Sequence, residues 1–290
     1  MMDPNKKASY SSFAHGTIDL FSLGDIGSLM SPRIGIIGGT GVYDPQAFKV
    51  KDRIRMSTPY GAPSDAVLVG EMGGTEVAFL SRHGTGHVLP PHMVNYRANI
   101  WALKQLGVER IISPCAVGSL KEEYRPGDLV IVDQFIDQTR GRSYTFYDGS
   151  KTVHISMADP FCQEMSALFA KEAARLGIRH HMGGTYVCIE GPRFSTRAES
   201  RMYRQFADII GMTLVPECQL AREMDMCYSS LATITDYDVW SPEVVDIATI
   251  IKVMEENVGK VQRLIAAVLP LIPAERTACV CPHTLKDAGI

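Results

Sequence analysis

Apolar residues along this chain fall into two patterns. Short uninterrupted runs are typical of buried strands, and longer segments with apolar positions every three or four residues are typical of amphipathic helices. The runs lie at 33–38, 66–72, 76–81, 110–119, 128–135, 183–195, 209–217 and 227–240. The helical segments lie at 94–107, 158–177, 195–208 and 245–272, with a short helix before residue 227. This alternation predicts a mostly parallel or mixed sheet with helices on both faces, the α/β class.

Turn and capping residues sharpen some of these boundaries. Gly73 and Gly74 separate two strand-like runs, which predicts a hairpin. Gly107 ends one helical segment, and Asp159 and Pro160 are placed to begin another. Since neither an internal repeat nor a linker interrupts the pattern, we expect a single domain over residues 32–272, with a loose tail at 1–31 and a C-terminal tail at 273–290.

Composition narrows the class of protein. Hydrophobic residues make up 46% and charged residues 21%, which suits a folded domain with a sizeable core. The net charge of −3 and the lack of a basic stripe argue against a nucleic-acid binder. No apolar run approaches the length of a membrane span or of a secretory signal, so we expect a cytoplasmic protein.

The chain has seven cysteines, an odd number that does not suit a disulfide scaffold. Most of them are expected to be buried thiols. Cys279 and Cys281 differ because they lie one residue apart in a polar C-terminal segment, which suggests redox chemistry or a clamp on the tail. A lone C-x-C lacks the four ligands of a structural zinc site, so the pattern argues against zinc.

In open α/β sheets the ligand binds beyond the carboxyl ends of the strands. That rule selects the segments that follow the strand-like runs. They are residues 38–41, 81–87, 114–119, 191–195, 212–213 and 235–240. We therefore expect these six segments to meet at one site.

The first segment, which contains Thr40, ends an apolar run in a glycine turn suited to an anion. It fails the G-x-G-x-x-G dinucleotide pattern, because Asp44 stands at the last glycine position, and it lacks the Gly-Lys-Ser/Thr of a P-loop. A small anion bound at Thr40 and a tight turn without a ligand both remain open.

The segment "SRHGTGH" places Arg82, His83 and His87 at a strand end. The planar guanidinium of Arg82 suits an oxyanion such as phosphate. The two histidines are four residues apart, as in a helical zinc pair, but Gly84 and Gly86 disfavour a helix there. An exposed polar loop is the alternative.

In "TDYDVW" an apolar run leads directly into Thr235, Asp236 and Asp238. Strand alternation would place both aspartates on one side, where their proximity would tend to raise the pKa of one of them. That arrangement suits a proton donor, although turn-forming aspartates that cap a helix are the alternative. The chain has no G-x-S-x-G elbow, and Cys115 is more typical of a packed thiol than of a nucleophile.

Taken in order, these segments resemble the 5′-methylthioadenosine phosphorylase family of the trimeric nucleoside phosphorylase superfamily. The resemblance covers about residues 32–270 and rests on "IGIIGGTG", "PYGAPSD", "SRHG", "VNYRANIWALKQLG", "GSL", "PGDLVIVDQFID", "FYDG", "HISMADPFC", "IEGPRFSTRAES", "GMTLVPE" and "TDYDVW". The fold that it implies, a mixed central sheet flanked by helices, agrees with the pattern described above.

The resemblance implies three groups of site residues. The phosphate ligands would be Thr40, Arg82, His83, the backbone of Ala116, and Thr213. The purine and ribose would contact Phe194, Ser195, Met212, Thr235, Asp236 and Asp238. The 5′-methylthio group would lie near Ile247, Ile250 and Ile251, and near His154 from a neighbouring subunit.

The implied reaction is phosphorolysis of 5′-methylthioadenosine to adenine and 5-methylthioribose 1-phosphate. Phosphate would be the nucleophile, and a protonated Asp236 would assist departure of the base. No metal or organic cofactor is implied, and the assembly would be a homotrimer or a dimer of trimers. Ser195 and Asp236 stand where 6-oxopurine enzymes carry Glu and Asn, which favours adenine. A broad purine nucleoside phosphorylase and a hydrolase that uses water are the alternatives.

Two features depart from the common pattern. Cys115 stands where the family often has Thr, so one hydroxyl donor to phosphate is absent. The C-terminal C-x-C resembles tails of heat-loving archaeal members in which disulfides occur. The resemblance thus suggests Cys162–Cys227 and Cys279–Cys281 as candidate disulfides, with buried thiols as the alternative.

Overall fold

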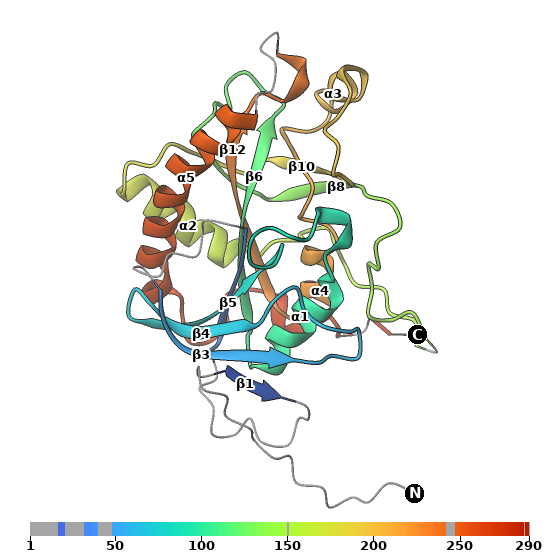
Figure 1. Ribbon diagram of the computed structural model, residues 1–290, viewed down its shortest axis with the longest axis vertical. Helices are drawn as coiled ribbons and strands as arrows, with labels where there is room; N and C mark the ends of the chain where they lie inside the picture. The colour runs from blue at the N-terminus through green and yellow to red at the C-terminus, as the bar shows by residue number, and fades with distance from the viewer. Residues whose placement is uncertain are drawn as a thin grey trace, which may run out of the picture.

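The computed structural model describes residues 17–20, 32–39, 48–149, 151–241, 247–286 and 288–289, without the side chains of 17–20 and 247–250. Within these ranges, twelve strands form one mixed sheet with helices on both faces, which confirms the predicted α/β class (Figure 1). The longest path through the sheet runs β1-β3-β4-β5-β2-β6-β11-β10-β8. The strands are β1 Thr17–Leu20, β2 Ile34–Gly38, β3 Lys49–Met56, β4 Val67–Met72, β5 Thr75–Ser81, β6 Arg110–Ser119, β7 Leu129–Ile131, β8 Gln134–Gln138, β9 His180–Met182, β10 Thr185–Ile189, β11 Ile209–Gly211 and β12 Cys227–Asp236.

Strand β6 lies at the centre of the sheet. Its first residues pair in parallel with β2, and β12 runs parallel to it along nearly its whole length. Its last residues, Gly118 and Ser119, pair antiparallel with β11 instead. Because β6 has neighbours on both edges and helices over both faces, its sequence is an almost continuous apolar run.

The helices cover the sheet in two groups. On one side α2 (Gln163–Arg175) packs against α5 (Ile247–Val268), and on the other α1 (Tyr96–Gln105) packs against α4 (Glu217–Glu223) (Figure 1). Among the described residues a further α-helix, α3 (Arg197–Tyr203), begins with a capping box between Thr196 and Glu199. None of the described helices is both long enough and apolar enough to cross a membrane.

Several predicted boundaries are confirmed. The hairpin around Gly73 and Gly74 joins β4 to β5. Helix α1 begins after Asn95, whose side chain accepts a hydrogen bond from the backbone of Ala98, and ends before Gly107, whose φ is 88°.

Other boundaries differ from the prediction. Helix α2 begins at Gln163 rather than near Asp159, because the backbone N–H of Cys162 donates to Tyr228 on β12 and holds that residue extended. The run at 128–135 divides into β7 and β8, which pair with different strands. Strand β3 was not predicted, since its charged and mostly exposed residues lack an apolar run.

The two chain ends also contain structure. Within the tail predicted at residues 1–31, β1 pairs in parallel with β3. In the C-terminal segment, Gly289 forms an isolated bridge with Val153, and the backbone N–H of His154 donates to Ala288 over 2.8 Å. The C-terminal segment therefore lies against the fold.

Candidate active site

The six segments expected to meet at one site all border a single cavity of about 280 Å³. This volume is near the lower end of the usual range for small-molecule sites. The lining residues include Gly39, Arg82, His83, His87, Pro91, Cys115, Ala116, Gly118, Phe194, Ser195, Met212, Thr213, Thr235, Asp236, Asp238 and Met254. Three strand ends position most of these side chains, namely those of β5, β6 and β12.

Ten of the site residues implied by the sequence line this cavity: Arg82, His83, Ala116, Phe194, Ser195, Met212, Thr213, Thr235, Asp236 and Asp238. His154 and Ile251 do not line it, and the Ile251 side chain is 50% exposed. Thr40 lies outside the described residues, and so do the side chains of Ile247 and Ile250.

Arg82 is almost fully buried and is heavily hydrogen-bonded within the protein. Besides an ion pair with Glu217, its Nη2 donates to the Ile37 carbonyl over 2.8 Å and to the Ser113 hydroxyl over 2.7 Å. Its Nη1 makes one longer contact, 3.3 Å to the Pro114 carbonyl. The guanidinium therefore offers a ligand its positive charge and at most the remaining N–H of Nη1.

Glu217, the buried partner of Arg82, was not identified from the sequence. Its Oε1 also accepts hydrogen bonds from Ser113 over 2.7 Å and from the Tyr228 hydroxyl over 2.8 Å. A single glutamate at the start of α4, 135 residues after its partner, carries no pattern that would reveal this pairing.

His83 is buried beside Arg82. Burial and the adjacent guanidinium lower the pKa of His83 to about 4, so its ring is neutral at neutral pH. Its Nδ1 lies 2.8 Å from the Leu89 carbonyl, which requires Nδ1 to carry the proton. A neutral His83 therefore presents the lone pair of Nε2, and it becomes a donor to an anion only after taking up a proton.

Cys115 lines the same part of the cavity. Burial raises the pKa of its thiol to about 11, so the thiol is protonated at neutral pH. Its sulfur lies 3.6 Å from the Ser230 hydroxyl. This environment agrees with a packed thiol and does not activate Cys115 as a nucleophile.

Asp236 and Asp238 lie together, although not by strand alternation. Strand β12 ends at Asp236, and Asp238 begins a 3-10 turn (Asp238–Trp240) with a φ of 48°. The Asp236 carboxylate accepts from the Thr235 hydroxyl and from the backbone N–H of Asp238, each over 2.7 Å. These bonds orient the carboxylate and leave further lone pairs for a ligand.

The pKa of Asp236 is raised, chiefly by burial, and the charge of Asp238 adds to this effect. Repulsion between the two acids, the cause that the sequence suggested, is thus present but smaller than the effect of burial. Asp238 is held separately by the Ser195 hydroxyl, which lies 2.9 and 3.0 Å from its two carboxylate oxygens. Ser195 therefore orients Asp238 in the absence of a ligand.

Gly118 on β6 makes room for both acids. A Cβ atom at this position would lie 3.1 Å from Oδ1 of Asp236 and 3.4 Å from Cβ of Asp238. Glycine is therefore needed here because a side chain would crowd the two aspartates, and not because the backbone adopts an unusual conformation.

The rest of the cavity is mainly apolar. Phe194 lines the cavity and is 50% exposed, so part of this aromatic side chain remains available for contact with a ligand. Met212 packs against Gly191, where a Cβ atom would lie only 2.6 Å from its sulfur. Met254 on α5 completes the lining and was not identified from the sequence, although it lies one helical turn after Ile250 and Ile251.

Arg142, also not identified from the sequence, connects two segments of the cavity wall. Its Nη1 donates to the Met212 carbonyl over 2.9 Å, and its Nη2 donates to the Glu190 carbonyl over 2.7 Å. The guanidinium is buried and contributes a further ion pair with the Glu190 side chain. Arg142 thereby fixes the segment after β10 relative to the segment after β11.

Known proteins provide an independent comparison. Residues 33–270 match the family model described as the phosphorylase superfamily. The chain is 60% identical over 255 residues to an S-methyl-5'-thioadenosine phosphorylase from Pyrococcus horikoshii, with 88% of this chain and 98% of the relative covered. The corresponding protein of Thermococcus kodakarensis is 61% identical, with the same coverage.

Solved structures agree with this result. A methylthioadenosine phosphorylase from an antarctic soil metagenomic library matches with a TM-score of 0.85 and 46% identity, covering 90% of this chain and 93% of that chain. A methylthioadenosine phosphorylase from Schistosoma mansoni in complex with adenine gives a TM-score of 0.81 and 38% identity, covering 85% and 94%. The chain therefore belongs to the phosphorylase superfamily and, within it, to the S-methyl-5'-thioadenosine phosphorylase family.

Proposed function

We propose that this protein cleaves 5′-methylthioadenosine by phosphorolysis to adenine and 5-methylthioribose 1-phosphate. The observation that carries the proposal is that one cavity is lined both by a buried cation with histidine, Arg82 and His83, and by the acid pair Asp236 and Asp238. The first group suits phosphate, and the second suits a purine that leaves with developing negative charge. Family membership supports the same reaction.

In the proposed reaction, phosphate binds beside Arg82, His83, the Ala116 backbone and Thr213. The charge of Arg82 attracts the dianion, and since Glu217 balances that charge, phosphate is not held so tightly that attack is suppressed. Thr40 is proposed as a further ligand from the glycine turn. Cys115 provides no hydroxyl here, so the phosphate relies on the other donors.

In the chemical step, a phosphate oxygen forms a bond to C1′ of the ribose while the bond from C1′ to N9 of the purine breaks. The electron pair of that bond passes into the purine, and protonated Asp236 delivers its proton to N7. Burial favours the protonated form of Asp236, because it raises the pKa of the carboxyl group. Asp238 and Ser195 are proposed to bind the 6-amino side of the base.

The apolar residues are proposed to position the substrate. Phe194 stacks on the purine, and Met212 lies against the ribose. The 5′-methylthio group is assigned to Ile247, Ile250 and Ile251, with Met254 at the same end of α5. An apolar environment there favours methylthio over hydroxyl by the burial of the extra methyl and sulfur.

A substrate panel tests this function. Release of base from 5′-methylthioadenosine, adenosine and inosine is measured with and without phosphate, and the sugar product is identified by phosphorus NMR. We expect release to require phosphate and to be fastest with 5′-methylthioadenosine. Release without phosphate would identify a hydrolase, and a preference for inosine would exclude the proposed role of Asp236.

We further propose that the active form is a homotrimer or a dimer of trimers in which His154 serves a neighbouring site. His154 is exposed and does not line the cavity of its own chain, which supports this proposal. Sedimentation measures the assembly directly. Co-expressed His154→Ala and Asp236→Asn subunits should be more active together than either is alone, because mixed assemblies contain sites with both groups intact. Activity of the mixture equal to the average of the two variants would exclude a shared site.

A further inference from the structure

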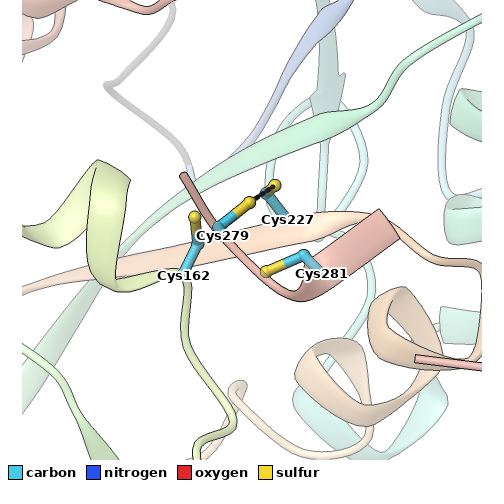
Figure 2. Close-up of side chains that lie close together, drawn as sticks. All are labelled: Cys162, Cys227, Cys279 and Cys281. Atoms are coloured by element: carbon cyan, nitrogen blue, oxygen red, sulfur yellow. Dashed lines mark hydrogen bonds between the residues drawn. The ribbon is translucent and has the colours of Figure 1, made fainter. Parts of the chain in front are cut away.

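Outside the active site, four cysteine side chains from three separate segments lie together (Figure 2). Cys162 precedes α2, Cys227 is the first residue of β12, and Cys279 and Cys281 come from the C-terminal segment. All four sulfur atoms lie within 4.8 Å of one another. Three of these residues are buried, and Cys279 is half-buried.

The spacing of the sulfurs suits a tetrahedral metal ion. A Zn–S bond of about 2.3 Å places two sulfurs of a tetrahedron about 3.8 Å apart. Cys227 and Cys279 already lie 3.6 Å apart, and no two of the four sulfurs are more than 4.8 Å apart. The largest separation thus exceeds the tetrahedral value by about 1 Å. Small side-chain rotations would therefore bring all four sulfurs onto one ion.

The charge around the cluster favours thiolates. Arg222 is buried, and its Nη1 lies 3.5 Å from the Cys281 sulfur. Among the described residues, its Nη2 has one hydrogen-bond acceptor, the Ser156 carbonyl, and its Nε has no partner. Among the ion pairs of the described residues, Arg222 has no carboxylate partner. A buried guanidinium requires a nearby negative charge, and the cysteine sulfurs are placed to supply it.

One further feature stabilises negative charge on sulfur. Cys162 occupies the N-cap position of the 13-residue helix α2, where the helix dipole lowers the energy of an anion.

We propose that Cys162, Cys227, Cys279 and Cys281 bind one Zn²⁺ as four thiolates. Four sulfur ligands in a tetrahedral arrangement suit zinc among the common divalent ions. Binding forms four Zn–S bonds and releases four thiol protons, which gives the site a net charge of −2 opposite the +1 of Arg222. The sequence argued against zinc because the C-x-C pair lacks two ligands, and the fold supplies both.

Pairing of the same sulfurs into two disulfides is the competing chemistry. The structure records all seven cysteines as free. Two disulfides would be neutral and would leave the buried Arg222 guanidinium without a counter-charge, which is why the zinc site is favoured.

The ion would have a structural role. It would join the start of α2, the start of β12 and the C-terminal segment, which are far apart in the sequence. The same C-terminal segment contacts residues 153–154 through Gly289 and Ala288. Zinc bound here would therefore hold the chain end on the fold and, through it, the strand-like segment that contains His154.

Metal analysis of the full-length protein tests this proposal. The protein is purified without chelators, reduced under anaerobic conditions, incubated with Zn²⁺ and separated from free ion by gel filtration. We expect one zinc per chain by elemental analysis. Replacement by Co²⁺ should produce the thiolate-to-cobalt charge-transfer absorption of a four-sulfur site. These wild-type measurements do not depend on whether any variant folds.

Variants locate the site. Cys227→Ser and the double variant Cys279→Ser/Cys281→Ser should lose most of the zinc and the charge-transfer absorption. Cys218→Ser is the matched control, because Cys218 is also buried but lies outside the cluster, and it should keep both. Zinc retained by the double variant would overturn the assignment.

Thiol counting distinguishes the competing chemistry. After denaturation with chelator and without reductant, the zinc protein should show seven reactive thiols, one for each cysteine. Two disulfides would leave seven minus four, or three, reactive thiols. Three reactive thiols in the protein as isolated, or no retained zinc in the reduced protein, would overturn the proposal.

Discussion

Arg82 and Glu217 form a two-point ion pair in which Nε of Arg82 lies 2.7 Å from Oε2 of Glu217 and Nη2 lies 2.9 Å from Oε1. Both side chains are almost completely buried. Glu217 contributes the largest favourable interaction that keeps the Arg82 guanidinium charged despite its burial. The proposed phosphate site therefore depends on a residue of α4 that is 135 positions away from Arg82 in the chain.

The first prediction concerns this pair. Glu217→Gln keeps the shape of the side chain but leaves Arg82 buried without a counter-charge. We expect the free energy of unfolding to fall by about 3–5 kcal/mol, measured by urea denaturation. Because phosphate replaces the missing negative charge, it should stabilise this variant more than it stabilises the wild type. Glu71→Gln, in an exposed pair with Lys51, is the control and should have little effect on either quantity. If phosphate stabilised the wild type and Glu217→Gln equally, the charge of Arg82 would not be part of the phosphate site.

The second prediction concerns Asp236. If its protonated form delivers the proton to N7, turnover of 5′-methylthioadenosine is highest below the raised pKa of Asp236 and falls as the pH rises through it. Asp236→Asn should lower kcat by about 100- to 10,000-fold and remove this dependence. It should also raise the relative activity on inosine. A pH–rate profile checks the prediction, and an unchanged basic limb in Asp236→Asn would assign that limb to another group.

The third prediction concerns the space beside the two acids. In Gly118→Ala the new methyl group lies against Oδ1 of Asp236, so the carboxyl group must move. We expect kcat to fall by roughly 10- to 100-fold, while the KM for phosphate stays nearly the same. The control is Gly259→Ala on α5, where a Cβ meets no atom within 4 Å, and which should retain full activity. Full activity of Gly118→Ala would show that the position of Asp236 is not critical.

The fourth prediction concerns His83. Its pKa is about 4 without a ligand, and a bound dianion raises the pKa by favouring the protonated ring. Anion binding therefore takes up a proton, and affinity should increase as the pH falls from neutral toward 4. Sulfate is the better probe, because it does not itself titrate in this range. Calorimetry should show that sulfate affinity increases at lower pH in the wild type and not in His83→Gln. If the affinity of both proteins changed equally with pH, the proton would be taken up by a group other than His83.

The sequence predicted the sheet, its class and the six segments that meet at the cavity, because these depend on local apolar patterns and on a general rule for α/β sheets. It also placed Asp236 beside Asp238, but for a different geometric reason. Strand alternation does not bring them together, since β12 ends at the first acid and the second acid follows in a 3-10 turn with positive φ.

Long-range pairings could not be predicted in this way. Nothing local to Arg82 indicates that Glu217 will occupy most of its donors, and nothing near the C-x-C pair indicates that Cys162 and Cys227 will lie beside it. Both outcomes depend on which elements become neighbours in the fold, and a single sequence does not contain that information. The predicted start of α2 was wrong for a similar reason, because a tertiary hydrogen bond from the backbone N–H of Cys162 delays the start of this helix.

The central position of β6 has a thermal consequence. Ile111 and Ile112 belong to the buried core, whereas Cys115 to Gly118 of the same strand form a wall of the cavity. This wall cannot melt locally without separating β6 from β12, so it shares the cooperativity of the whole sheet. On heating, this wall should therefore be lost, together with the activity that depends on it, only when the whole protein denatures. In enzymes whose sites are built from loosely attached loops, activity is lost before global denaturation.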